Sequence, residues 1–170
     1  DHAAGRDRQQ AHAGCWNRCC MRYGISAAAL IVQDEQILLV NHREAGCYDF
    51  WVPPGGRLEG DESIFQCTKR EAFEETGLDV ELDRILYIQE FWEPGYHFIK
   101  VFILAKAFSG TLTLANRGQE ESFLADARFL AQDDLRQVTV HPEILKGQFW
   151  SDLKSEHPVT RYLGLEKIRY

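Results

Sequence analysis

A segment between residues 55 and 78 carries the residue types best suited to chemistry, because paired glycines precede a cluster of acidic residues. Its second half reads Arg70-Glu71-Ala72-Phe73-Glu74-Glu75-Thr76-Gly77. On a helix, Glu71 and Glu75 lie one turn apart on one face, and Glu74 lies about 60° from Glu71. Clustered carboxylate oxygens are hard ligands that suit magnesium or manganese. The segment is therefore predicted to hold a divalent cation.

The residues around this cluster predict how it is positioned. Asp61 or Ser63 can cap a helix that runs to about Thr76, and Gly77 stands where a helix end favours a left-handed residue. The pair Gly55-Gly56 lets the backbone approach a ligand closely. The helix N-terminus behind this pair favours an anion such as phosphate. The alternative interpretation is an amphipathic helix whose acidic side simply faces water.

The same segment resembles the signature of the Nudix hydrolase (MutT-like) family, which is Gly-x5-Glu-x7-Arg-Glu-U-x-Glu-Glu-x-Gly-U with U a bulky aliphatic residue. Every fixed position is matched, from Gly56 through Glu62 to Gly77, and Ala72 stands at the first U. The resemblance covers about residues 24–150. It implies an α/β fold: a Nudix-type α/β/α sandwich with a mixed β-sheet and the catalytic helix after a Gly-rich loop.

The resemblance implies hydrolysis of a pyrophosphate bond in a nucleoside diphosphate linked to another moiety, by attack of metal-activated water on phosphorus. Mg²⁺ (or Mn²⁺) is the implied cofactor. ADP-ribose or another nucleoside diphosphate sugar is the first expected substrate, since Pro94, sixteen residues past Leu78, resembles a feature of the ADP-ribose-hydrolysing subgroup. The alternatives are a house-cleaning hydrolase of nucleoside triphosphates or dinucleotides, an RNA cap or 5′-triphosphate hydrolase, and a non-catalytic nucleotide-sensing domain. Sensing domains usually lack the glutamates that this chain retains.

The resemblance also implies roles for individual residues. Arg70 is expected to orient the glutamates by ion pairing, and Glu62 to support the junction between loop and helix. The groups expected to hold the metal are the carboxylates of Glu71, Glu74 and Glu75 and the carbonyl of Gly55. The general base is expected to be one of these glutamates or a loop carboxylate: Glu120, Glu121 or Asp126. The residues expected to contact substrate are Arg43, Gly55, Gly56, Phe91, Trp92 and Tyr96.

Apolar runs predict the strands around the helix. Residues 25–32 and 37–40 are expected to form a hairpin across a polar turn. Residues 80–89 alternate as a strand does, and 98–108 form a long apolar strand. The local pattern predicts an aromatic loop over 91–95 and one short helix over 141–153. His97 is expected within reach of substrate. The other histidines, His42, His141 and His157, are expected at the surface or at caps.

Composition sets the remaining expectations. The chain of 170 residues has a formal net charge of −7, which argues against a nucleic-acid-binding surface. The expected partner is therefore a small nucleotide, and no DNA is expected to bind. No apolar run is long enough to cross a bilayer, so no membrane partner is expected. Five cysteines, an odd number, favour a reducing, cytoplasmic compartment. The expected organisation is a disordered or upstream segment over 1–20, a Nudix hydrolase domain over 21–153 and a C-terminal tail over 154–170, with a homodimer allowed.

Overall fold

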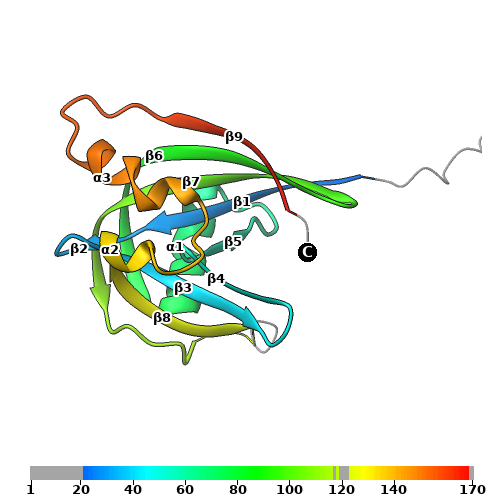
Figure 1. Ribbon diagram of the computed structural model, residues 1–170, viewed down its shortest axis with the longest axis horizontal. Helices are drawn as coiled ribbons and strands as arrows, with labels where there is room; N and C mark the ends of the chain where they lie inside the picture. Colours follow the sequence, from blue (N-terminus) through cyan, green and yellow to red (C-terminus); the bar gives the residue numbers. More distant parts are fainter. Residues whose placement is uncertain (1–20, 117, 119–122, 169–170) are drawn as a thin grey trace, which may run out of the picture.

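The computed structural model describes residues 21–116, 118 and 123–168, which form two β-sheets and four short or medium helices (Figure 1). The predicted segment over 1–20 and the candidates Glu120 and Glu121 lie outside the described residues. The larger sheet is mixed, because its second strand runs parallel to its third and its last strand runs parallel to its fourth, while the other neighbours are antiparallel. The strand order in this sheet is β5 (Gly55–Arg57), β1 (Arg22–Leu30), β7 (Tyr96–Gly110), β6 (Leu78–Glu93) and β9 (Arg161–Lys167).

The second sheet is antiparallel and is organised around one central strand. That strand, β3, pairs with each of the other three. The strands are β2 (Val32–Gln33), β3 (Gln36–Glu44), β4 (Tyr48–Val52) and β8 (Leu124–Ala131).

Helices cover both faces of the mixed sheet (Figure 1). Helix α1 (Ile64–Thr76) packs its Ala72 with Ala29 of β1 and with Ile31, which follows that strand. Ala28 and Leu30 of the same strand pack instead with buried side chains of the short helices. Since successive residues of a strand face opposite sides, α1 and the short helices lie on opposite faces. These short helices are α2 (Gln132–Leu135), η2 (Glu143–Lys146) and α3 (Gln148–Leu153).

The limits of α1 follow from local sequence. The Ser63 hydroxyl accepts a hydrogen bond from the backbone N–H of Gln66, and the Gln66 side chain accepts one from the Ser63 N–H. This reciprocal pair closes the first turn. At the other end Gly77 adopts φ 73° and donates to the Phe73 carbonyl, 2.8 Å away. The predicted helix, with Ser63 and Gly77 as its caps, is confirmed.

Three predictions about the surrounding elements need correction. The predicted hairpin forms only at its tip, where β2 pairs with β3 across the polar turn, because β1 and β3 lie in different sheets. The predicted aromatic loop over 91–95 belongs to a long hairpin, since β6 continues to Glu93 and β7 begins at Tyr96. Aromatic residues favour strands, and Pro94-Gly95 alone makes the turn. The predicted helix over 141–153 is two helices, because Gly147 separates η2 from α3.

The C-terminal residues add an edge strand to the mixed sheet. Strand β9 runs parallel to β6, with Ile88 opposite Tyr162. Asp152 of α3 secures it, because both carboxylate oxygens accept hydrogen bonds from Arg161 and one also accepts from the Tyr87 hydroxyl. Asp152 is only 6% exposed, so this ion pair is partly desolvated and fixes where β9 begins.

Candidate active site

The glycine pair lies directly against the acidic face of α1. The Gly55 N–H donates to Glu75 Oε2 at 2.7 Å, and a Cβ on Gly56 would overlap the carboxylate of Glu71. Glu71 and Glu75 are 7% and 3% exposed, so neither is a solvated side chain of the kind that the alternative interpretation requires. The backbone of these glycines lies close to the helix carboxylates, and its predicted approach to a ligand stays a prediction.

Arg70 joins the carboxylates of this site. Its guanidinium donates to both oxygens of Glu62, at 2.6 and 3.0 Å. The same group reaches Glu71 Oε1 at 2.8 Å and Glu74 Oε2 at 3.0 Å. The hydrogen bonds from Arg70 lower the pKa of Glu62 to about 2, and those carboxylates in turn raise the pKa of Arg70. The guanidinium is thus the positive partner that the crowded carboxylates were expected to need.

The donor groups fit a hard divalent cation. Among residues 21–116, 118 and 123–168, no three His, Cys, Asp or Glu side chains form a ready metal cluster, and Arg70 instead contacts two of the helix glutamates. The three glutamates still supply oxygens of the type that Mg²⁺ prefers. The carboxylate of Glu71 can lie against the loop only because residue 56 lacks a Cβ. Glu71, Glu74 and Glu75 would hold the cation.

Lys100 is a site residue that sequence reasoning missed. It lies opposite Ser26 of β1 and Gln89 of β6, so three polar residues form one row across adjacent strands. Its Nζ lies 5.9 Å from the Phe102 ring. Burial lowers the pKa of Lys100, and the negative charges of Glu75 and Glu71 oppose that shift. A lysine in the first half of an apolar strand was the available signal.

The aromatic candidates are only partly brought together. Phe91 and Tyr96 both stack on Phe98, each with ring centroids 5.1 Å apart. The guanidinium of Arg57 lies 4.6 Å from the Tyr96 centroid. Trp92 follows Phe91 in the strand and therefore faces the other side of the sheet. A stacking role for Phe91 and Tyr96 stays a prediction, and Trp92 lies apart from them.

The remaining polar candidates have partners of their own. Arg43 is exposed near the β3–β4 turn and pairs with Asp49 at 2.9 Å. Asp126 of β8 forms an ion pair with Arg128. His97 Nε2 lies 2.8 Å from Glu90 Oε2. None of these contacts tests whether the residues meet a substrate.

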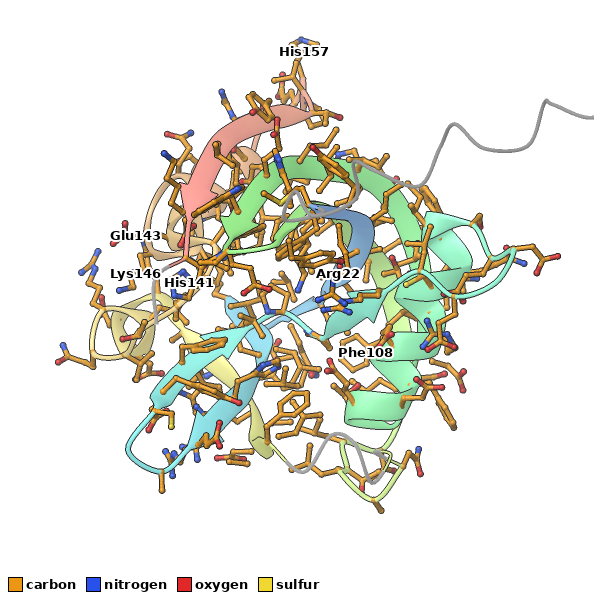
Figure 2. All side chains as sticks on the ribbon, turned by 90° about the vertical axis from the view of Figure 1, so that its right-hand side faces the viewer. Arg22, Phe108, His141, Glu143, Lys146 and His157 are labelled. Atoms are coloured by element: carbon orange, nitrogen blue, oxygen red, sulfur yellow. The ribbon has the colours of Figure 1, made fainter. Side chains whose placement is uncertain are left out.

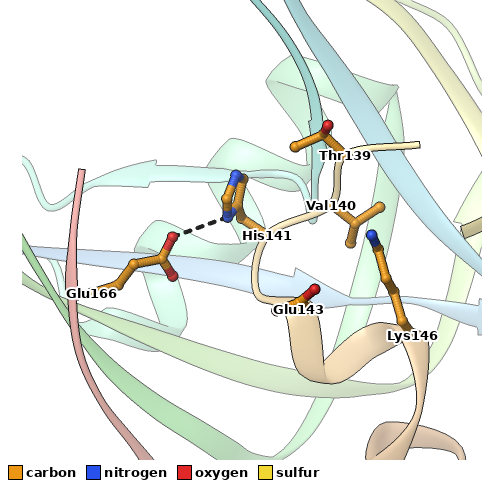
Figure 3. A pocket seen from close by; sticks show the side chains of 6 residues that line it. All are labelled: Thr139, Val140, His141, Glu143, Lys146 and Glu166. Atoms are coloured by element: carbon orange, nitrogen blue, oxygen red, sulfur yellow. Dashed lines mark ion pairs between the residues drawn. The ribbon is translucent and has the colours of Figure 1, made fainter. Parts of the chain in front are cut away.

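A cavity of about 330 Å³ opens beside the second sheet (Figure 3). The Trp51 N–H donates to the Thr139 carbonyl at 2.8 Å, and the His141 N–H donates to the Trp51 carbonyl at 2.9 Å. His141 was expected at the surface or at a cap; its side chain is 37% accessible, and it lines this cavity. Figure 2 shows it at the molecular edge near Glu143 and Lys146, far from His157. The lining residues are Thr139, Val140, His141, Glu143, Lys146 and Glu166.

His42 was also expected at the surface or at a cap, and this is wrong. Its ring lies among aromatic side chains, 5.3 Å from Phe50 and 4.8 Å from Phe123 between centroids. Its buried Nε2 has no hydrogen-bond partner in the part of the chain that the structure describes. Burial, and secondarily the charge of Lys100, lowers its pKa to about 4.

We expect acid to destabilise the protein through His42. The unfolded chain titrates near its ordinary pKa of 6.5 and the folded chain near 4, so between these values the unfolded state binds more protons. This part of the stability is complete above pH 6.5 and declines as pH falls towards 4. His42→Phe should therefore lose less stability than the wild type between pH 7 and pH 4.5, measured by urea denaturation. His157→Phe, at an exposed histidine, serves as the control. An equal loss in wild type and His42→Phe would exclude this assignment.

A glycine turn held against buried helix carboxylates, on a mixed sheet between helices, defines a Nudix-type domain. The chain belongs to the Nudix family, since the family model described as NUDIX domain matches residues 22–148. The chain is 32% identical to the 8-oxo-dGDP phosphatase NUDT18 of Homo sapiens over 163 residues, which cover 86% of this chain and 49% of that protein. It is 25% identical to an ADP-ribose pyrophosphatase of Methanocaldococcus jannaschii over 108 residues, or 62% of this chain and 64% of the relative.

A solved structure agrees with the fold. The crystal structure of a MutT NUDIX hydrolase from Burkholderia pseudomallei aligns with a TM-score of 0.60 at 30% identity, over 71% of this chain and 92% of the other. The family and the α/β fold predicted from the sequence are confirmed. The chain spans between 30% and 49% of the length of the NUDT18 relatives from three animals. Within the described residues, no helix is both long and apolar enough to cross a membrane.

Proposed function

We propose that this chain hydrolyses the pyrophosphate bond of a nucleoside diphosphate derivative, with a divalent metal ion. The observation that carries the proposal is that Glu71, Glu74 and Glu75 are gathered on one helix beside Arg70 and the Gly55 N–H, because clustered carboxylate oxygens are the ligands that Mg²⁺ prefers. A bound Mg²⁺ would supply neutralisation of the phosphate charge and a more acidic water.

Residues of this chain position the carboxylates and the positive charge that the reaction needs. The Gly55 N–H fixes Glu75, and Arg70 fixes Glu71 and Glu74. Lys100 adds a positive charge beside these carboxylates, where it can attract a phosphate oxygen. The proton of the attacking water passes to a carboxylate, for which the candidates are Glu74, Glu120, Glu121 and Asp126.

The relatives narrow the substrate class. NUDT18 is named for 8-oxo-dGDP and the archaeal relative for ADP-ribose, and both compounds are nucleoside diphosphate derivatives. The match to human NUDT18 extends over 86% of this chain and the match to the archaeal protein over 62%. The longer match favours an oxidised nucleoside diphosphate over ADP-ribose, which the sequence alone placed first.

A substrate panel with and without metal tests the proposal. Phosphate release, with a coupled phosphatase wherever the products are phosphomonoesters or a coupled pyrophosphatase wherever the product is pyrophosphate, would be followed from 8-oxo-dGDP, ADP-ribose, other nucleoside diphosphate sugars, diadenosine polyphosphates and nucleoside triphosphates. We expect turnover of one class, reduced more than about 100-fold by excess chelator and restored by Mg²⁺, because the metal supplies most of the charge neutralisation. A thermal melt in chelator checks that the chain stays folded. Full turnover in chelator, or no turnover of any compound by folded protein with Mg²⁺, would contradict it.

A further inference from the structure

Two arginines share one aromatic ring near the start of β1. The guanidinium of Arg57, in β5, lies 4.6 Å from the Tyr96 centroid, and that of Arg22, the first residue of β1, lies 5.6 Å from it. Both distances are within the range of about 6 Å over which a cation is attracted to an aromatic ring. Figure 2 shows Arg22 well apart from Glu143 and Lys146, which line the cavity.

These two positive charges are available to an anion. Both side chains are exposed. In the part of the chain that the structure describes, neither Arg22 nor Arg57 forms an ion pair with a carboxylate. Two like charges held against one ring repel each other, and an anion between them would offset that repulsion.

The ring that supports the arginines is itself fixed in place. Tyr96 is only 6% exposed. A Cβ at Gly24 would overlap the Tyr96 hydroxyl, so the ring can lie across β1 only because this residue is glycine. Along β1, Gly24 falls midway between Arg22 and the residue opposite Arg57, so all three lie on one face of the sheet. Tyr96 is thus a rigid support between two long, flexible side chains.

The arginine pair adjoins the glycine turn of the active site. Arg57 directly follows Gly56, so their Cα atoms are about 3.8 Å apart. The Arg57 carbonyl accepts a hydrogen bond from Arg70 at 3.1 Å. Ser26 lies opposite both Arg57 and Lys100, so these two side chains leave the sheet on the same face. A diphosphate held beside the helix glutamates can therefore extend along β1 towards the arginine pair.

The charge of this pair distinguishes a free terminal phosphate from an esterified one. A phosphate at the end of a chain has a second acidic proton with a pKa near 6, so it carries about −1.5 to −2 charges at pH 7. A phosphate that is linked on both sides, as in a nucleoside diphosphate sugar, lacks that second charge. Guanidiniums bind phosphate oxygens through paired, charge-assisted hydrogen bonds. Two guanidiniums therefore favour the free terminal phosphate.

We propose that Arg22 and Arg57 bind the terminal phosphate of a nucleoside diphosphate, and that Tyr96 is a positioning residue that holds both guanidiniums for it. The inference rests on the proposed function and adds a binding site for that substrate. It gives a physical cause for preferring a free nucleoside diphosphate to a nucleoside diphosphate sugar. Arginines that only stabilised the fold would treat the two compounds alike.

Binding of two unreactive ligands by the full chain tests this inference without catalysis. The α,β-methylene analogues of ADP and of ADP-ribose share the nucleoside and the bridged diphosphate, and only the ADP analogue has a free terminal phosphate. Titration calorimetry with Mg²⁺ present would compare them on the wild type, Arg57→Gln and Arg22→Gln. The wild type should bind the ADP analogue more tightly.

Each arginine variant should lose about tenfold in affinity for the ADP analogue, as loss of one charge-assisted contact does. The affinity for the ADP-ribose analogue should change by less than about twofold, because that ligand lacks the second charge on its outer phosphate. Arg136→Gln, at an exposed arginine that pairs with Asp133, is the control and should change neither affinity.

Variants of Tyr96 separate positioning from stability. Tyr96→Phe keeps the ring and should keep the preference of the wild type for the ADP analogue. Tyr96→Leu removes the ring and should reduce that preference. If Tyr96→Leu lowers the melting temperature, the arginine variants still decide, since their side chains are exposed. Equal losses for both analogues, a preference that survives in both arginine variants, or no binding of the ADP analogue by folded wild type would overturn the inference.

The same titrations separate this inference from the proposed function. A preference for the free terminal phosphate that depends on Arg57, in a wild type that hydrolyses nothing, overturns the function and leaves the phosphate site standing. Metal-dependent hydrolysis by a protein that binds the two analogues equally overturns the phosphate site and leaves the function standing.

Discussion

Glu74→Gln should reduce kcat by at least about 100-fold while the protein stays folded. This loss is larger than the 10–100-fold loss that is typical when the mutated residue only orients a metal ligand by hydrogen bonding. Glu74 is the most exposed of the three helix glutamates, with 40% of its side chain accessible, so glutamine fits there without repacking. The substitution removes the negative charge and keeps the shape. Catalysis and metal binding should therefore suffer while stability changes little.

Matched variants make this result interpretable. Glu59→Gln changes an exposed glutamate in the loop before the helix and should leave kcat at the wild-type level. In Glu75→Gln the side-chain carbonyl can still accept from the Gly55 N–H, so the loop should hold its position while turnover falls. The measurements are steady-state kinetics, Mg²⁺ titration calorimetry and thermal melts. A near-native rate in Glu74→Gln would remove that residue from the catalytic set.

Features set by neighbouring residues were predictable from the sequence. The limits of α1 depend on Ser63, Gln66 and Gly77, all close to the ends they define. The contact of Gly55-Gly56 with the helix needed only the signature spacing and the absence of a Cβ. Such features depend on short-range hydrogen bonds and on steric limits, which local sequence expresses directly.

Strand partners were less predictable, because apolar alternation identifies a strand and not its neighbour. The runs in β1 and β3 are adjacent in sequence, and that proximity suggested a hairpin. Their side chains instead fill the space between two sheets, where Leu30 and Leu39 share one core cluster. Strand β9 was missed because its position depends on Asp152 and Tyr87, which no local pattern connects to Arg161.

The arrangements that were missed combine distant parts of the chain. The cavity combines residues 139–146 with Glu166, whose Oε2 accepts a hydrogen bond from the Gln89 amide. Lys100 becomes meaningful only once β7 is placed beside β1. Charged residues that come together only through the chain topology show no regular spacing in the sequence, whereas charged residues on one helix do.

Arg70→Met should destabilise the protein by about 2–3 kcal/mol and also lower turnover. Breaking a buried ion pair costs more than this when the pair is fully desolvated, and a quarter of the Arg70 side chain is exposed. The variant leaves Glu62, Glu71 and Glu74 without the guanidinium that contacts all three. Lys69→Met, at the exposed neighbour, removes one positive charge without breaking these contacts and should change stability little.

The dependence of this loss on pH identifies its cause. Arg70 holds the pKa of Glu62 at about 2, so the stability it provides is present above pH 4.5 and lost as pH falls towards 2. The difference between wild type and Arg70→Met in urea denaturation should therefore shrink over that range. Mg²⁺ should raise the melting temperature of Arg70→Met more than that of the wild type, because the variant has lost the guanidinium charge beside Glu71 and Glu74. A difference that is constant with pH and unaffected by Mg²⁺ would mean that Arg70 stabilises the fold by packing alone.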